Sequence, residues 1–310
     1  MSISADHDDN RSICTTCGIQ YTSTNRRPYR TGDEESGDGC VICLDERQYV
    51  APTGQNWTTW RKIEEDYKTE LVSEEKDRRV VRIMTEPSFG IGQTPFVVNS
   101  YRGSVIWDCQ AYLSDSAVAQ ILASTADKPL LGIAISHPHF YGSSVTWARK
   151  LGCKVFISAK DKEWFVRDDR NVAEVVEFWE GDRKVFADGL TMIRCGGHFP
   201  GSCVLHWDRS FEPPEPNLPT TGVVFCSDTF GIGSDHSKIS FMYSYPNMIP
   251  LPPWDIQALW HSLRPFAFED IYGAWPGNLS YGEGRSKVLK SARRFIEMEG
   301  WTKGEWKLED

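Results

Sequence analysis

The sequence LLGIAISHPH, at residues 130–139, decides which fold this chain is expected to adopt. Leu130 to Ile135 is short and nearly all apolar, which is typical of a strand covered on both faces of its sheet. The tetrapeptide SHPH follows directly. Residues two apart on an extended chain point the same way, so the imidazoles of His137 and His139 can reach one point. Because neutral imidazole is a good ligand for zinc and iron, the stretch predicts a buried strand that ends in a metal-binding pair.

Strand and helix signals alternate from about residue 80 onward. Runs rich in β-branched and aromatic residues predict strands at 94–98, 104–107, 130–135, 155–158, 190–195, 203–207, 222–226 and 271–275. Helical spacing of apolar residues predicts helices after the capping residue Ser114, over 143–151, from about 160, and over 288–296. The second half holds more strands than simple βαβ alternation gives. A sandwich of two sheets flanked by helices therefore fits best.

Two more candidate ligands follow later strands. His198 comes after Gly196 and Gly197, which allow a sharp exit from the strand at 190–195. Asp228 directly follows the strand expected around residue 225. Four candidate ligands thus stand at the ends of three strands, where α/β folds usually build their sites. A lone histidine at a strand end is more often a packed or surface residue, so the prediction depends on the combination.

Five motifs, in this order and spacing, resemble those of the metallo-β-lactamase superfamily over about residues 80–300. They are VIWD at 105–108, SHPHFYG at 136–142, GGH at 196–198, CSDT at 226–229 and WPGN at 275–278. The resemblance implies an α/β fold, an αββα sandwich of two mixed sheets flanked by helices. It also implies that His137, His139 and His198 hold one metal ion, and that Asp228 bridges it to a second.

The chain departs from the family pattern at the second metal. Tyr141 and Gly142 replace the Asp-His half of the first motif, and Asn278 replaces the final histidine. Those three positions carry the family's ligands for its second ion, so the sequence predicts one occupied site. His236 is either a substitute ligand or an exposed loop histidine.

Further roles are implied by the same resemblance. Asp108 corresponds to an aspartate that orients a metal-binding histidine, which fixes the imidazole tautomer; otherwise it is a turn-forming residue. Tyr141, in the vacated second site, is expected to donate a hydrogen bond to a developing oxyanion. The segment FMYSYP at 241–246 either lines an apolar pocket or forms a core strand. The expected pocket residues are Tyr141, Met242, Tyr245 and Asn278.

Four early cysteines form two Cys-x-x-Cys pairs, Cys14 with Cys17 and Cys40 with Cys43. Two such pairs offer four thiolates in a tetrahedron, which is the preferred geometry of structural zinc. Redox pairs are the alternative, but the thioredoxin-like βαβ context is missing. We therefore expect a zinc-ribbon-like segment at 1–60, a charged connector at 61–79 and the main domain at 80–310. The remaining cysteines and histidines are interpreted as structural: Cys109, Cys153, Cys195, Cys203, Cys226, His206 and His261.

Composition and charge limit the classes of partner that this protein is expected to bind. The net charge is −9 and no long basic run occurs, which argues against a nucleic-acid surface. No stretch approaches the roughly 20 apolar residues that cross a bilayer. Residues 1–10 are polar and acidic, unlike a secretory signal. We expect a cytoplasmic protein, whose cysteines are reduced, with a small-molecule substrate and neither nucleic acid nor membrane as partner.

The expected function is metal-dependent hydrolysis of a small lactam, lactone, ester or thioester. The ion is expected to be zinc, because zinc lowers the pKa of a bound water toward 7 and so produces hydroxide at neutral pH. Asp228 completes the coordination or deprotonates that water. A mononuclear iron enzyme of the same fold is one alternative, because the ligands suit iron as well. A non-catalytic binding protein that docks a partner through its zinc module is the other.

Overall fold

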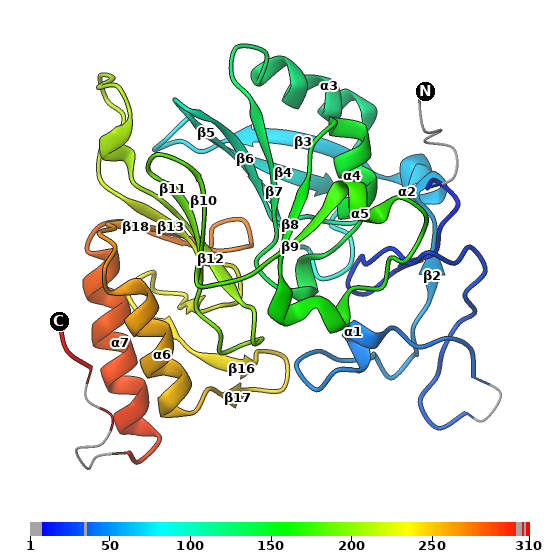
Figure 1. Ribbon diagram of the computed structural model, residues 1–310. Coiled ribbons are helices and arrows are strands. Elements are labelled where there is room, and N and C mark those ends of the chain that lie inside the picture. Colours follow the sequence, from blue (N-terminus) through cyan, green and yellow to red (C-terminus); the bar gives the residue numbers. More distant parts are fainter. Residues whose placement is uncertain (1–7, 34–35, 302–305, 307) are drawn as a thin grey trace.

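Two β-sheets lie face to face between outer helices in the computed structural model, which describes residues 8–33, 36–301, 306 and 308–310 (Figure 1). The first sheet has the order β3-β4-β5-β6-β7-β8-β9. Its pairs are antiparallel from β3 to β6 and parallel from β6 to β9, so the sheet is mixed. The strands are β3 (Lys68–Ser73), β4 (Val80–Glu86), β5 (Phe96–Ser100), β6 (Gly103–Trp107), β7 (Leu130–Ala134), β8 (Val155–Ser158) and β9 (Val176–Trp179).

The second sheet is also mixed, with the order β10-β11-β12-β13-β18-β19. Only the β13–β18 pair is parallel. The strands are β10 (Arg183–Ala187), β11 (Leu190–Arg194), β12 (Cys203–Trp207), β13 (Val223–Phe225), β18 (Asp270–Tyr272) and β19 (Leu279–Ser280). Short hairpins leave this sheet, formed by β14 (Gly231–Ile232) with β15 (Ile239–Ser240) and by β16 (Met242–Ser244) with β17 (Ile249–Pro250).

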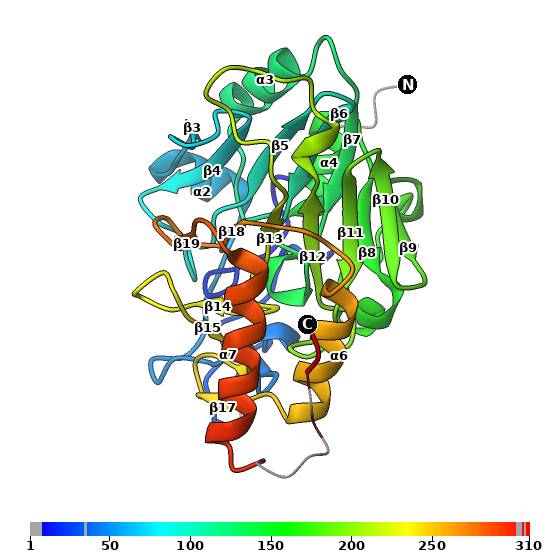
Figure 2. The same cartoon turned by 90° about the vertical axis from the view of Figure 1, so that its left-hand side faces the viewer.

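Helices cover the outer face of each sheet (Figures 1 and 2). The first sheet carries α3 (Asp115–Ser124), α4 (Ser144–Leu151) and α5 (Val172–Val175), and the second carries α6 (Pro253–Leu263) and α7 (Gly284–Met298). Ser114 caps α3 as predicted, because its hydroxyl accepts a hydrogen bond from the backbone N–H of Ala117. The helix expected from about residue 160 is a 3-10 helix, η3 (Ala159–Trp164). The αββα sandwich is confirmed.

Aromatic side chains from both sheets fill the space between them. Phe225 stacks on Tyr272 with ring centroids 5.2 Å apart, and the ring of Phe96 meets both of them edge-on. Trp107 and Trp207 are buried in the same cluster. Burying one large side chain contributes about 1.5–3 kcal/mol, so this layer holds the sheets together and fixes the strand ends that carry the site.

The cysteine-rich segment packs onto the first sheet and shares its core. β1 (Ile13–Cys14) pairs with β2 (Trp57–Thr58), and α1 (Val41–Leu44) lies between them in sequence. Ile13 and Ile42 are buried in one cluster with Ile83 and Val97 of the sheet. The segment expected as a connector continues this arrangement, because it contains most of α2 (Trp60–Asp66) and the edge strand β3. No helix in the described part of the chain is long and apolar enough to span a membrane.

Candidate metal centre

The two histidines after β7 meet at a turn in the backbone. His137 is extended, with φ −169° and ψ 173°, and Pro138 begins the 3-10 helix η2 (Pro138–Phe140). This change of backbone brings Nε2 of His137 and Nδ1 of His139 within reach of the same carboxylate oxygen. The side chains reach one point, as the sequence indicated, but the chain is not extended through both residues.

Left-handed backbone positions deliver the other two side chains. Gly196 and Gly197 have φ of 70° and 83°, which glycine adopts without strain. A methyl group at residue 197 would also lie 2.9 Å from Leu251 Cδ1. Ser227, with φ 48°, turns the chain after β13 so that Asp228 faces His137.

The four side chains form one buried group at the carboxyl ends of their strands. None of them is more than 6% exposed. Asp228 Oδ2 lies 3.3 Å from His137 Nε2, 3.6 Å from His139 Nδ1 and 3.9 Å from His198 Nε2. The latter two nitrogens are 3.2 Å apart. A tetrahedral ion with bonds of about 2.0–2.1 Å separates its ligands by about 3.3 Å, so the group fits one such ion.

The ionisation states of the group also suit a cation. Burial lowers the pKa of His137 to about 4, and burial beside His137 and His139 lowers the pKa of His198 well below its usual value. Burial opposes ionisation of Asp228, but its contacts with His137 and His139 hold its pKa below the usual range. The neutral imidazoles of His137 and His198 therefore face a carboxylate anion at pH 7. His137 Nε2 is buried without a hydrogen-bond partner among the described residues, so a metal ion would supply the missing contact.

Neighbouring groups fix two of the imidazoles. Ser136 Oγ lies 2.8 Å from His137 Nδ1, and the backbone carbonyl of Met242 lies 3.2 Å from His198 Nδ1. Asp108 makes no hydrogen bond or ion pair with any histidine in the described part of the chain. Its carboxylate accepts hydrogen bonds from the Ser136 N–H, at 2.7 Å, and from the Ser227 hydroxyl, so it positions His137 through Ser136 and Asp228 through Ser227. The role expected for Asp108 is therefore indirect.

The four early cysteines meet in a second buried group. Cys14 Sγ lies 3.7 Å from Cys43 Sγ, and Cys17 Sγ lies 3.7 Å from Cys40 Sγ. A tetrahedral zinc ion with Zn–S bonds of about 2.3 Å separates its sulfurs by about 3.8 Å, so this four-cysteine group also fits one ion. Gln55 donates to Cys14 Sγ at 3.0 Å, which favours a thiolate there.

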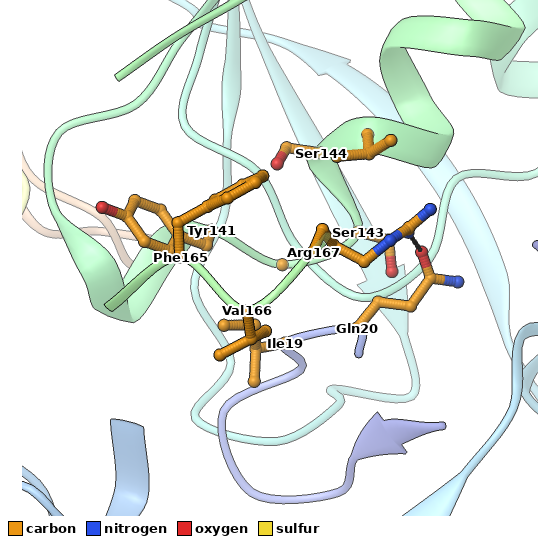
Figure 3. A pocket seen from close by; sticks show the side chains of 10 residues that line it. Ile19, Gln20, Tyr141, Ser143, Ser144, Phe165, Val166 and Arg167 are labelled. Carbon is orange, nitrogen blue, oxygen red and sulfur yellow. Dashed lines mark hydrogen bonds between the residues drawn. The ribbon is translucent and has the colours of Figure 1, made fainter. Parts of the chain in front are cut away.

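Three residues stand where the metallo-β-lactamase superfamily has ligands for a second metal, and here they pack against neighbouring segments: Tyr141, Gly142 and Asn278. The Tyr141 side chain is 1% exposed and lies beside Phe165 (Figure 3). Its hydroxyl donates to the backbone carbonyl of Asp161 at 2.8 Å. It is therefore unavailable to a substrate, in contrast to the role expected for it. A methyl group at Gly142 would lie 2.6 Å from the Gln110 carbonyl oxygen, so no larger residue fits there. Asn278 donates to the Ile232 carbonyl at 3.2 Å.

A cavity of about 470 Å³ opens onto His139, His198 and Asp228. Of the pocket residues expected from the sequence, only Tyr245 lines it; its ring centroid is 5.8 Å from that of His198. Met242 contributes its carbonyl to His198, and neither its side chain nor that of Asn278 lines the cavity. The other lining residues were not expected: Gln48, Tyr49, Gly90, Ile91, Pro246 and Trp275. No local motif marks them, since they come from distant segments of the chain.

The other histidines in the described part of the chain lie outside this group. His236 is exposed, and its ring nitrogen contacts the backbone carbonyl of Leu279 at 2.5 Å. His206 Nε2 contacts the Ala267 carbonyl at 2.9 Å. Neither residue is part of the two groups that could hold a metal ion. His236 is therefore the exposed loop histidine of the two interpretations.

Comparison with solved structures identifies the class of fold. The metallo-β-lactamase DIM-1 superposes with a TM-score of 0.50 at 11% identity, covering 75% of this chain and 98% of its own. VMB-1 gives a TM-score of 0.50 at 11% identity, with the same coverage. At this level of identity the likeness defines architecture alone. The chain has the metallo-β-lactamase fold, with an added N-terminal segment that carries the four-cysteine group.

A closer relationship defines the family. No family model matches the sequence. The uncharacterized protein YmaE of Bacillus subtilis (strain 168) is 34% identical over 285 residues, which cover 92% of this chain and 95% of YmaE. The chain belongs to the same family as YmaE.

Proposed function

We propose that this protein is a metal-dependent hydrolase that cleaves a small lactam, lactone, ester or thioester with one ion, held by His137, His139, His198 and Asp228. The proposal rests on four buried ligand atoms that converge beside a cavity large enough for a small molecule. We further propose zinc for this site, and a structural zinc ion for the four-cysteine group, because both sets of distances suit its tetrahedral geometry.

An ion in the histidine group supplies the Lewis acidity that makes water a nucleophile at neutral pH. The protein's own part is to keep the imidazoles of His137 and His198 neutral and the Asp228 carboxylate charged. Asp228 faces the cavity, so the carboxylate oxygen that does not contact the histidines can accept a proton from an attacking water. Ile91, Pro246 and Trp275 give the cavity apolar walls that exclude bulk water from the reacting carbonyl.

The second metal and Tyr141 are both absent from this mechanism. Among the described residues that line the cavity, Gln48, Tyr49 and Tyr245 carry side chains able to donate a hydrogen bond. Trp275 also has an N–H group, but it donates to the Ile91 carbonyl at 2.9 Å. We therefore assign stabilisation of a developing oxyanion, on the protein's side, to one of these three side chains.

His198→Ala and Asp228→Asn test the proposal when turnover of a panel of lactams, lactones, esters and thioesters is measured alongside metal content. His198→Ala removes a ligand, so one ion per chain and all turnover should be lost. Asp228→Asn removes charge and basicity, so turnover should fall by about 10²-fold or more. His236→Ala is the matched control, because that histidine is exposed, and it should retain both metal and turnover.

Two results would change the conclusion. Hydrolysis that persists unchanged in His198→Ala would show that the activity does not belong to this site. Iron, rather than zinc, in the histidine group would favour the alternative of a mononuclear iron enzyme, since this ligand set suits both metals.

A further inference from the structure

The segment Asp45–Tyr49, which closely follows the candidate zinc ligand Cys43, forms one wall of the cavity. Gln48 and Tyr49 line it together with His139, His198 and Asp228. In space the segment lies beside the β16–β17 hairpin, about 200 residues away in the sequence (Figure 1). The cysteine-rich part of the chain therefore contributes directly to the site.

Arg47 clamps this segment to the metal centre. Its guanidinium lies 4.4 Å from the ring centroid of Phe199, 4.5 Å from that of Tyr243 and 5.5 Å from that of Trp164. It also pairs with Asp45 at 2.8 Å. Phe199 in turn contacts the rings of the three histidines of the metal centre. The clamp therefore fixes the segment relative to the candidate ligands.

Side chains of the β16–β17 hairpin donate hydrogen bonds to three backbone carbonyls of the segment. Asn247 Nδ2 donates to the carbonyls of Glu46 and Gln48, at 2.9 and 3.1 Å, and Ser244 Oγ donates to that of Arg47 at 3.2 Å. The side-chain carbonyl oxygen of Gln48, which is one of the residues that line the cavity, has no such partner in the described part of the chain. Gln48 is only 5% exposed, and its Oε1 is buried without a hydrogen bond among the described residues.

Leaving a buried carbonyl oxygen unpaired is energetically costly. Methionine or leucine would fill the same space without that cost, so packing does not account for a glutamine here. A ligand that donates an N–H group to Oε1 removes the cost. A ligand that lacks the N–H leaves the oxygen unpaired, and a polar site rejects such a ligand strongly.

We propose that Gln48 is a substrate-recognition residue and that it selects ligands carrying a neutral amide beside the reacting carbonyl. The amide N–H donates to Oε1, and the amide carbonyl accepts from the Nε2 group of the same side chain. A carboxylate or a ketone offers an acceptor only and cannot satisfy Oε1. The identity of the reacting carbonyl rests on the proposed function, but amide recognition itself does not.

Two small probes test amide recognition by their binding, so the test does not depend on a measurement of turnover. Pyrrolidin-2-one and cyclopentanone have the same ring size and carbonyl, and differ by N–H in place of CH2. Each is titrated into the metal-loaded full-length protein while the side-chain amide signals of Gln48 are followed by ¹H–¹⁵N NMR. The signals are assigned by their loss in Gln48→Met. We expect pyrrolidin-2-one to shift them and to bind roughly 10-fold more tightly than cyclopentanone.

The variants separate recognition from folding. Gln48→Met keeps the side-chain length but removes both polar atoms, so the two probes should bind with equal affinity. Gln120→Met is the matched control, because Gln120 is exposed on α3, and it should keep the preference. If Gln48→Met does not fold, Gln48→Glu keeps an acceptor in place and should retain the preference for pyrrolidin-2-one.

Each outcome decides the proposal. Equal affinities in the unaltered protein, or a preference for the amide that survives in Gln48→Met, would overturn it. A preference that depends on Gln48 in a protein that hydrolyses none of the carbonyl panel would support amide recognition while the proposed hydrolase function fails. Hydrolysis of the carbonyl panel without the amide preference would support the proposed hydrolase function and overturn amide recognition by Gln48.

Discussion

Arg47→Met should release the cavity wall from the metal centre while leaving both metal groups intact. The arginine contacts three aromatic rings and pairs with Asp45, and its side chain is 13% exposed. Methionine retains similar length and apolar character but has no charge. The variant therefore removes the clamp with little change in volume.

The size of the effect follows from these contacts. Each of the two closer cation–π contacts is worth about 0.5–1 kcal/mol at a partly exposed site, and the more distant third ring adds less. The ion pair with Asp45 adds up to about 1 kcal/mol. The total is about 2–3 kcal/mol, which corresponds to a roughly 30-fold to 150-fold rise in the open population of the segment.

Native-state hydrogen exchange at the Gln48 amide measures this opening directly. That N–H donates to the Asp45 carbonyl at 3.0 Å in the closed segment. Its exchange rate should rise by the same factor in Arg47→Met. Arg26→Met is the matched control, since Arg26 lies over the rings of Tyr21 and Trp57 in the same module, at 4.0 and 4.5 Å.

The control variant should leave exchange at Gln48 unchanged. Unaltered exchange at Gln48 in Arg47→Met would refute the clamp. Equal acceleration in both variants would show that general loosening of the cysteine-rich module opens the wall, and that Arg47 has no special part in it.

Three further predictions concern stability and metal content. Cys40→Ser should lose one ion per chain and have a lower melting temperature, because the free energy of metal binding contributes to folding in such modules. The control Cys153→Ser should lose no ion. Unchanged zinc content and melting temperature in Cys40→Ser would exclude a structural zinc site. Burial raises the pKa of Asp161 to about 7, so the folded state keeps a proton that the unfolded state loses above about pH 4, and stability falls as pH rises between these values. Asp161→Asn should therefore stabilise the protein by up to about 4 kcal/mol at pH 8 and by little at pH 4, as measured by urea unfolding, and a gain independent of pH would contradict this assignment. Gly142→Ala should lower the free energy of unfolding by at least about 2 kcal/mol, because residue 142 has φ of 45° and the added methyl group meets the Gln110 carbonyl. Gly152→Ala should lower it by about 1 kcal/mol, because residue 152 has φ of 68° but open space around it. Equal losses in denaturant unfolding would show that the contact with Gln110 relaxes.

The sequence alone determined the architecture and the two groups of candidate ligands. Apolar runs and helical spacing are local properties, so they predicted the strands and helices of the sandwich. The histidines, Asp228 and the cysteine pairs follow strands or stand in short motifs, so their local spacing was enough to assign them to common sites. The roles of these residues in catalysis remain predictions.

The surroundings of those ligands were decided by tertiary structure. The resemblance placed Tyr141 at a ligand position of the second metal, and its expected role followed from that position. In the folded chain Tyr141 is buried, and its hydroxyl donates to the Asp161 carbonyl. Gln48 gave no signal in the sequence, because its position in the cavity depends on an arginine clamp and on a hairpin about 200 residues away. Periodicity and short motifs describe neighbours along the chain. Which side chains line a cavity depends on packing between distant segments, and only the folded chain defines that packing.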